Sequence, residues 1–208
     1  MSKKDELRQK AARKRLRLPL LLTMLQPSLD SWEYGIKGGE TVTLDKHSYT
    51  YAALDVPEKE KRVIRMMLGK IKKAQTDAIK EIGPEVFTKL PKKFYDDADE
   101  RIVMVEQATV KVCPDDTDLA TYQRVITYVI YSVLLDYYIS TNERRPGMMR
   151  LLSCLSGLCN YLIPPASPLI TPINEVYWDI WDNIMDGEAH PVYTELSEEE
   201  KRREKERS

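Results

Sequence analysis

The sequence predicts a mainly α-helical fold of about five to six helices, with a small β-hairpin near residues 31–45 and extended charged segments at both ends. Glycine is scarce, with 8 residues in a chain of 208, and charged side chains make up 31% of the residues. Few glycines and many long charged side chains favour helix. Hydrophobic residues make up 42%, and several recur at the three- and four-residue spacing of one helix face.

We expect the chain to have three parts. They are a basic N-terminal arm or helix over residues 1–26, a helical core domain with the hairpin over 27–193, and a charged helical tail over 194–208. A length of 208 residues fits one or at most two domains. Pro19 is predicted to break or restart the arm. The tail has no apolar stripe, which indicates an exposed helix.

The hairpin is predicted from a change of composition around the sequence Lys37-Gly38-Gly39-Glu40. Residues that favour β-strands lie on both sides of it, so we expect Trp32–Ile36 to pair with Thr41–Leu44 across this turn. The glycines do not indicate a phosphate-binding loop, because no Gly-Lys-Ser/Thr follows them and no helix opens there.

The clearest amphipathic helix is predicted over residues 57–82. Pro57 stands at the first-turn position, where its missing N–H costs nothing, and Gly83 ends the pattern. Residues 57–80 carry eight basic and three acidic side chains. Two interpretations stay open: a core helix with a solvated back, or part of a basic face that meets phosphates.

The segment TYQRVITYVIYSVLLDYYIS, residues 121–140, allows a membrane span, a buried strand or a core helix. Its uncharged part, 125–135, spans about 16 Å as a helix against about 30 Å of hydrocarbon, and it is unusually long for a strand. We therefore predict a helix over about 118–140, capped by Asp116 or Thr117. This helix is apolar on two sides, so it is either central in its own domain or shared with another subunit.

Two more helices are predicted towards the C-terminus. Pro146 opens the first, and residues 173–186 form the second. The proline-rich stretch 164–172 between them is expected to be a stiff extended connector. Residues 101–113 are rich in β-branched side chains and favour a strand, although the choice between strand and helix stays open.

Charge is divided unevenly along the chain. Through Lys93 there are 21 Lys and Arg against 12 Asp and Glu, a net charge of +9, and the remainder carries −10. A basic half suggests a phosphate-bearing or acidic partner. A basic half joined to an equally acidic half also suggests head-to-tail self-association.

The sequence shows no signature of catalysis, metal binding or cofactor binding. His47 and His190 lie far apart and stand in no triad context, and Rossmann, Walker A, HExxH and kinase signatures are absent. The acidic cluster 96–100 lacks the glycine and closing glutamate of an EF-hand. Three cysteines without a CxxC indicate small core residues in a reducing compartment. We expect no enzymatic activity, no metal and no cofactor.

These observations predict a structural or assembly subunit that contacts copies of itself and other assembly proteins, in the cytoplasm or within a virion. The architecture is similar to that of the small helical ring or adaptor subunits of phage particles, by analogy and not by sequence, and no motif identifies a family. The alternative is a sequence-independent nucleic-acid-binding protein that uses the basic N-terminal half. No transmembrane span is expected.

Cations of the arm and of the helix 57–82 are the candidates for contact with a partner or with nucleic acid. They are Lys3, Lys4, Arg8, Lys10, Arg13, Lys14, Arg15, Arg17, Lys59, Arg62, Lys70 and Lys73. Aromatic residues of the predicted helices 118–140 and 173–186 are the candidates for docking another subunit. They are Trp178, Tyr128, Tyr131 and Tyr138.

Two tryptophans of the last predicted helix are expected to differ in role. Trp181 falls in the apolar stripe and is expected in the core. Trp178 lies beside Glu175, Asp179 and Asp182, and an aromatic ring rimmed by acids suits a basic partner surface. The alternative is that both rings complete the protein's own core.

Overall fold

The computed structural model describes residues 3–44, 47–83, 105, 107–113, 117–142 and 144–185. Its elements are α1 (Lys3–Ile36), β1 (Glu40–Leu44), β2 (His47–Tyr51), α2 (Glu58–Ile82), α6 (Leu119–Thr141), α7 (Pro146–Leu162) and α8 (Ile170–Met185). The predicted fold class, mainly helical with one small hairpin, is confirmed.

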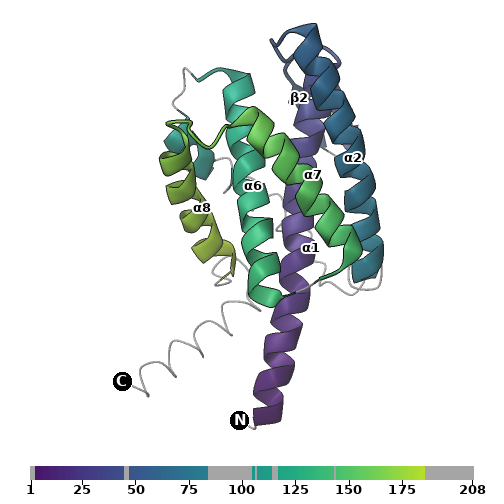
Figure 1. Cartoon of the computed structure of the whole chain (residues 1–208), viewed down its shortest axis with the longest axis vertical. Helices are drawn as coiled ribbons and strands as arrows, with labels where there is room; N and C mark the ends of the chain where they lie inside the picture. The colour runs from purple at the N-terminus through teal and green to yellow at the C-terminus, as the bar shows by residue number, and fades with distance from the viewer. Residues whose placement is uncertain are drawn as a thin grey trace.

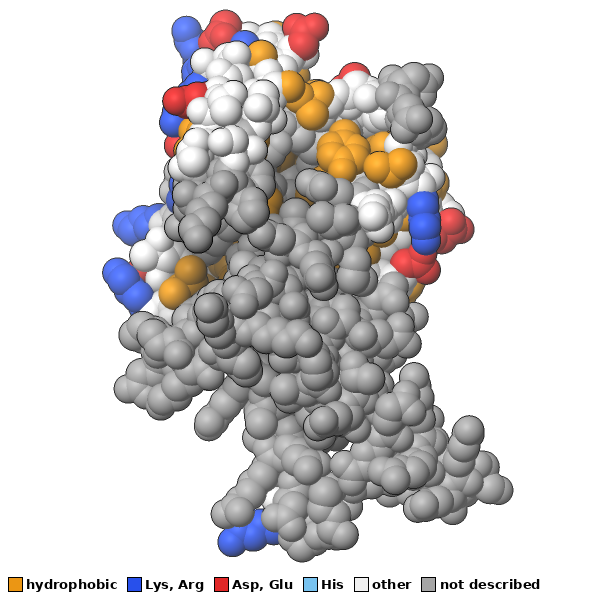
Figure 2. All heavy atoms as spheres, turned by 180° about the vertical axis from the view of Figure 1, so that it is seen from behind, with side chains coloured by type: hydrophobic (Ala, Val, Ile, Leu, Met, Phe, Trp, Pro, Cys, Tyr) orange, Lys and Arg blue, Asp and Glu red, His pale blue; other side chains and the backbone are white. Residues whose placement is uncertain are grey.

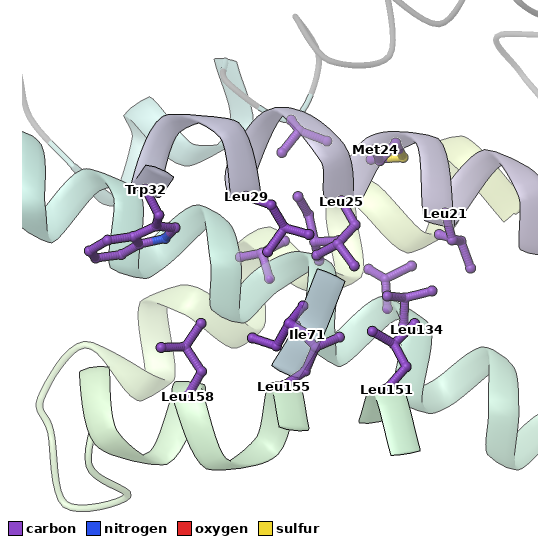
Figure 3. Close-up of a cluster of buried hydrophobic side chains, with 14 of the residues drawn as sticks. Leu21, Met24, Leu25, Leu29, Trp32, Ile71, Leu134, Leu151, Leu155 and Leu158 are labelled. Atoms are coloured by element: carbon purple, nitrogen blue, oxygen red, sulfur yellow. The ribbon is translucent and has the colours of Figure 1, made fainter. Parts of the chain in front are cut away.

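Four of the helices enclose one core (Figure 1). Neighbouring pairs follow the cyclic order α1, α2, α7, α6, and α8 packs on α6 outside this ring. Figure 3 shows leucines of α1 and α7 pointing into the same interior, where Ile71 of α2 and Leu134 of α6 also lie. The first turns of α1 extend beyond the other labelled helices (Figure 1).

α1 runs through Pro19 and Pro27 as one helix, so the predicted break at Pro19 is wrong. A proline inside a helix costs about 3 kcal/mol, whereas burying one leucine side chain contributes about 1.5–3 kcal/mol. Leu18, Leu21 and Leu25 belong to a longer run of buried side chains along α1. Their burial outweighs the two prolines. The division of the chain at residue 26 falls inside this helix and stays a prediction.

The predicted strand Thr41–Leu44 is confirmed as part of β1, but its partner strand lies further along the chain than predicted. β1 pairs with β2 in antiparallel register, with Glu40 opposite Tyr51. The predicted partner strand, Trp32–Ile36, is instead the last part of α1. Trp32 is fully buried, and this burial against the bundle outweighs the β propensity of the segment.

The two glycines predicted as the hairpin turn end α1 instead. Gly38 and Gly39 have φ of 109° and 84°, values that favour glycine over other residues. The Gly39 N–H donates to the carbonyl oxygen of Tyr34 at 3.0 Å, which satisfies a carbonyl of the last helical turn. The chain then turns back into β1.

The structure corrects the cap of α6. The Asp118 carboxylate accepts hydrogen bonds from the hydroxyl of Thr121 at 2.6 Å and from its backbone N–H at 2.9 Å. These two bonds, the hydroxyl bond first, lower the pKa of Asp118. The cap is therefore Asp118, one or two residues beyond the predicted Asp116 or Thr117.

α6 is the central helix of its own bundle, the first of the two predicted roles, and a contact of α6 with another subunit stays a prediction. It packs against α1, α7 and α8, and residues on several sides of it are buried, among them Val125, Val129 and Leu134. The two apolar faces seen in the sequence therefore face different helices of the same chain.

Two irregular segments also differ from expectation. Residues 107–112 are helical, so a strand there is wrong: Val105, Thr109 and Cys113, spaced by four, are all buried, as on one helix face. The stretch 164–172 is not an extended connector. It turns, with the Ser167 N–H donating to the Pro164 carbonyl at 2.8 Å, and then enters α8.

A buried polar seam joins α1 to α6. The indole N–H of Trp32 donates to the hydroxyl oxygen of Thr127 at 2.6 Å, and that hydroxyl donates to the Gln123 carbonyl at 2.9 Å. The Gln123 side-chain amide donates to the Ser31 hydroxyl at 2.6 Å. Trp32 and Thr127 are both fully buried, so the bond between them has no competition from water, whereas the Gln123–Ser31 bond is partly buried.

A second polar contact joins α2 to the start of α7. The backbone N–H of Gly147 donates to a carboxylate oxygen of Glu81 at 2.6 Å, and the Arg145 guanidinium donates to the Glu81 carbonyl at 2.9 Å. The contact is close because Gly147 has no side chain. A Cβ there would stand 2.8 Å from the Glu81 carboxylate and 2.9 Å from the Ala78 nitrogen.

We predict that Gly147→Ala lowers the free energy of unfolding by about 1–3 kcal/mol, because the added methyl group overpacks the contact between α2 and α7. The matched control is Gly157→Ala in the same helix, where a Cβ meets nothing within 4 Å. That change is expected to raise stability by about 0.5–1 kcal/mol. Urea denaturation measures both, and equal effects of the two changes contradict the contact.

We also predict that Thr127→Val lowers the free energy of unfolding by about 1–3 kcal/mol, because it leaves the buried Trp32 N–H without its acceptor. Thr76→Val is the control. Thr76 is an exposed residue whose hydroxyl makes the same bond to the carbonyl four residues back, that of Lys72, at 2.9 Å. Its replacement is expected to change stability by less than about 0.5 kcal/mol. Similar losses in both variants argue against the polar seam.

Candidate interaction surfaces

The exposed side of α2 carries a line of cations. All four cations predicted in this helix are exposed, and Lys80 extends the line by one more. We call this set the α2 stripe: Lys59, Arg62, Lys70, Lys73 and Lys80. From first to last it spans about 32 Å of helix. Figure 2 shows Lys and Arg side chains projecting from the edge of the molecule that α2 forms, at the left of that view.

The acidic residues of α2 form their hydrogen bonds and ion pairs with groups other than the stripe cations. Each of the four makes a contact with a group outside the stripe. Glu58 pairs with Lys61 and Arg65, Glu60 with Arg124, Asp77 with Arg150, and Glu81 with the Gly147 N–H. Within the described part of the chain, none of the five stripe cations pairs with a carboxylate.

An apolar side chain interrupts the stripe. Met66 is 55% exposed and lies one turn from Arg62 on one side and from Lys70 on the other. The neighbouring Met67 instead packs against the core. A large exposed apolar side chain among charges is a feature typical of contact surfaces.

α8 lies on the other side of the bundle from α2 (Figure 1). It carries an exposed aromatic side chain beside acidic residues, whereas α2 carries an exposed apolar side chain among cations. Trp178 is 52% exposed, and Glu175 and Asp179 beside it are exposed. Asp179 pairs with Lys111 at 2.9 Å. The side chain of Asp182, the third predicted acid, lies outside the described residues. We call Glu175, Trp178 and Asp179 the α8 face.

The two tryptophans of α8 differ in burial. Trp178 lies edge-on against Tyr177, with ring centroids 4.7 Å apart. Trp181 is half-buried and packs against the core beside the buried Ile180. The alternative in which both rings complete the core is therefore wrong for Trp178.

The predicted docking tyrosines lie on α6, not on the α8 face. Tyr128, Tyr131 and Tyr138 are half-buried and pack against the core. The rings of Tyr128 and Tyr131 meet edge-on with centroids 6.4 Å apart, and burial raises the pKa of Tyr128. Their docking role stays a prediction, and they present less surface to a partner than Trp178 does.

The N-terminal arm is helical in its backbone from Lys3 onward. Lys3 and Lys4 are exposed and stand at the end of α1 that extends beyond the bundle (Figure 1). The structure does not bring these two lysines into the α2 stripe. The other arm cations have side chains that lie outside the described residues: Arg8, Lys10, Arg13, Lys14, Arg15 and Arg17.

The described residues offer little for metal or thiol chemistry. No three His, Cys, Asp or Glu side chains among them converge as a metal site. All three cysteines are free thiols; Cys113 and Cys159 are buried, and burial raises the pKa of both thiols. A raised pKa keeps a thiol protonated and unreactive. Over the same residues, no helix has the length and apolar character needed to cross a membrane.

Comparison of the chain with models of protein families, with curated proteins and with solved structures finds no match.

We predict that Trp181→Ala lowers the free energy of unfolding by about 2–3 kcal/mol, because a half-buried core aromatic is lost. Trp178→Ala is expected to change it by less than about 1 kcal/mol, because the ring is exposed and loses only its edge contact with Tyr177. Thermal and urea unfolding of the two variants are compared. If Trp178→Ala destabilises as much as Trp181→Ala does, Trp178 is a core residue and no docking role follows.

Proposed function

We propose that the protein is an assembly subunit that binds copies of itself head to tail, with the α2 stripe of one copy on the α8 face of the next. One observation carries the proposal. The described chain holds a line of unneutralised cations on one side and an exposed aromatic flanked by acids on the opposite side. Opposite charges on two separate surfaces attract neighbouring copies.

The placement of the two surfaces on opposite sides gives such an assembly its form. A contact between two different surfaces leaves one of each free at the ends, so it adds copies until a ring closes or a filament grows. This fits the ring or adaptor-like component of a large particle, such as a virion, that the architecture and charge division of the sequence suggested.

A second candidate function is sequence-independent binding of nucleic acid. The α2 stripe supports it, since a row of Lys and Arg suits a row of phosphates. Met66 favours the first candidate, because an exposed apolar side chain in the middle of the stripe gains more from a protein surface than from phosphates.

We predict that Lys70→Glu weakens self-association about tenfold or more, because it reverses a charge near the centre of the stripe. Lys37→Glu, which makes the same change of net charge at an exposed residue just after α1, is the control and is expected to change self-association little. Sedimentation of both variants and the parent protein over a range of concentrations, at low and at high salt, measures the effect. Circular dichroism checks that each variant is folded.

The outcomes separate the two candidates. Salt-sensitive self-association of the parent that is lost in Lys70→Glu supports the assembly subunit. A parent protein that stays monomeric at every concentration in low salt, yet changes the fluorescence anisotropy of a labelled DNA oligonucleotide, supports the second candidate. Deletion of residues 1–17 then tests whether the arm contributes to that binding.

A further inference from the structure

Two exposed apolar side chains stand at the centres of the two surfaces just described. Among the described residues, the large exposed hydrophobic side chains are Met66, Val110, Ile139, Met149, Tyr161 and Trp178. Met66 lies between two cations of the α2 stripe, one turn from each, and Trp178 lies one turn after Glu175 of the α8 face. Each is an apolar centre with a charged rim, which is the usual anatomy of a binding hot spot.

The rims have opposite charge. Arg62 and Lys70 stand one helical turn before and after Met66, and neither has an acidic partner in the described chain. Glu175 stands one turn before Trp178 and likewise has no described cation beside it. Asp179 is already paired with Lys111 at 2.9 Å, so Glu175 is the carboxylate of the α8 face that is left for a partner.

The apolar centres also fit one another chemically. The flexible thioether of a methionine adapts to an aromatic ring and makes a favourable sulfur–aromatic contact. A guanidinium or ammonium group placed over an indole face is attracted by the ring. A tryptophan that docks on Met66 is therefore within reach of a thioether and of two cations, Arg62 and Lys70, that can lie over its ring face.

From this complementarity we infer that Trp178 of one copy docks on Met66 of the next, with Glu175 beside Trp178 facing Lys70 beside Met66. The occupant is a second copy of this chain. The inference rests on the proposed self-association and names its central contact.

The contact is tested by complementation between two variants that each lose one half of it. Met66→Ala removes the side chain on which Trp178 is proposed to dock but keeps Trp178. Trp178→Ala removes the indole ring but keeps Met66. Both side chains are more than half exposed, at 55% and 52%, so both variants are expected to fold. Each variant alone is expected to self-associate about tenfold or more weakly than the parent. Their equimolar mixture is expected to form dimers and nothing larger, because only one productive contact is available.

Met149→Ala is the matched control. Met149 is a methionine of α7 with 52% exposure, and its replacement is expected to leave assembly unchanged. The charge pair has its own test: Lys70→Glu and Glu175→Lys each weaken assembly, and the double variant, in which the pair is reversed, recovers it.

Sedimentation velocity measures the oligomeric state of each of these samples and of the parent protein. Dimers in the mixture, with weak association of each variant alone, support the contact. Variants that assemble as strongly as the parent, or a mixture that stays monomeric, overturn the contact while self-association of the parent stands. A parent protein that is monomeric throughout overturns both the contact and the proposed function.

Discussion

The position of every surface in this molecule depends on how α1 packs against α6. Burial of apolar side chains is non-directional, so by itself it specifies the register of two helices less sharply than hydrogen bonds do. The buried seam adds this specification. The Trp32 indole has one donor and finds its acceptor in Thr127 at 2.6 Å, while Gln123 reaches Ser31 at 2.6 Å. A shift by one residue would leave these buried groups without partners, at about 1–3 kcal/mol for each.

The orientation of α2 follows from that seam. α1 presents Gln26 and Glu33 to α2, where Gln75 donates to the Gln26 side chain at 3.2 Å and Lys72 pairs with Glu33. These contacts, together with buried Ile71, turn one side of α2 inward. The cations on the opposite side are therefore exposed. α1 thus determines which lysines of α2 are bound within the molecule and which are left for a partner.

Local pattern was enough to predict most helices and the exposure of the α2 cations, because a helix period repeats within a few residues. Successive steps of three or four residues from Lys59 reach Met66 after Arg62, and two steps beyond Lys73 reach Lys80. The break at Pro19 was predicted wrongly because the burial that overrides it comes from distant helices. The strand predicted around Thr109 is wrong for the same reason. β-Branched side chains favour a strand locally, but burial of residues spaced by four against the other helices favours a helix.

The sequence does not predict which groups the acidic residues of α2 pair with, and this pairing is what makes the α2 stripe a candidate site. Four acids lie in the same helix, and their pairing decides whether the stripe is neutral or charged. Glu60 pairs with Arg124 at 3.3 Å, from a position 64 residues away in the chain. Asp77 pairs with Arg150 at 3.5 Å, on α7. No rule of spacing predicts these contacts, because they depend on which helices become neighbours.

The unneutralised stripe is unfavourable for the isolated chain. Lys59 and Arg62 are three residues apart, as are Lys70 and Lys73, and like charges at this spacing destabilise a helix by about 0.2–0.5 kcal/mol per pair. The helix tolerates the repulsion because its other side, with Ile64, is buried in the core, and burying one such side chain contributes about 1.5–3 kcal/mol. An acidic partner surface would turn the same repulsion into attraction, and salt would weaken that attraction because these charges are exposed. Binding of such a surface would therefore relieve the repulsion without any change in the fold.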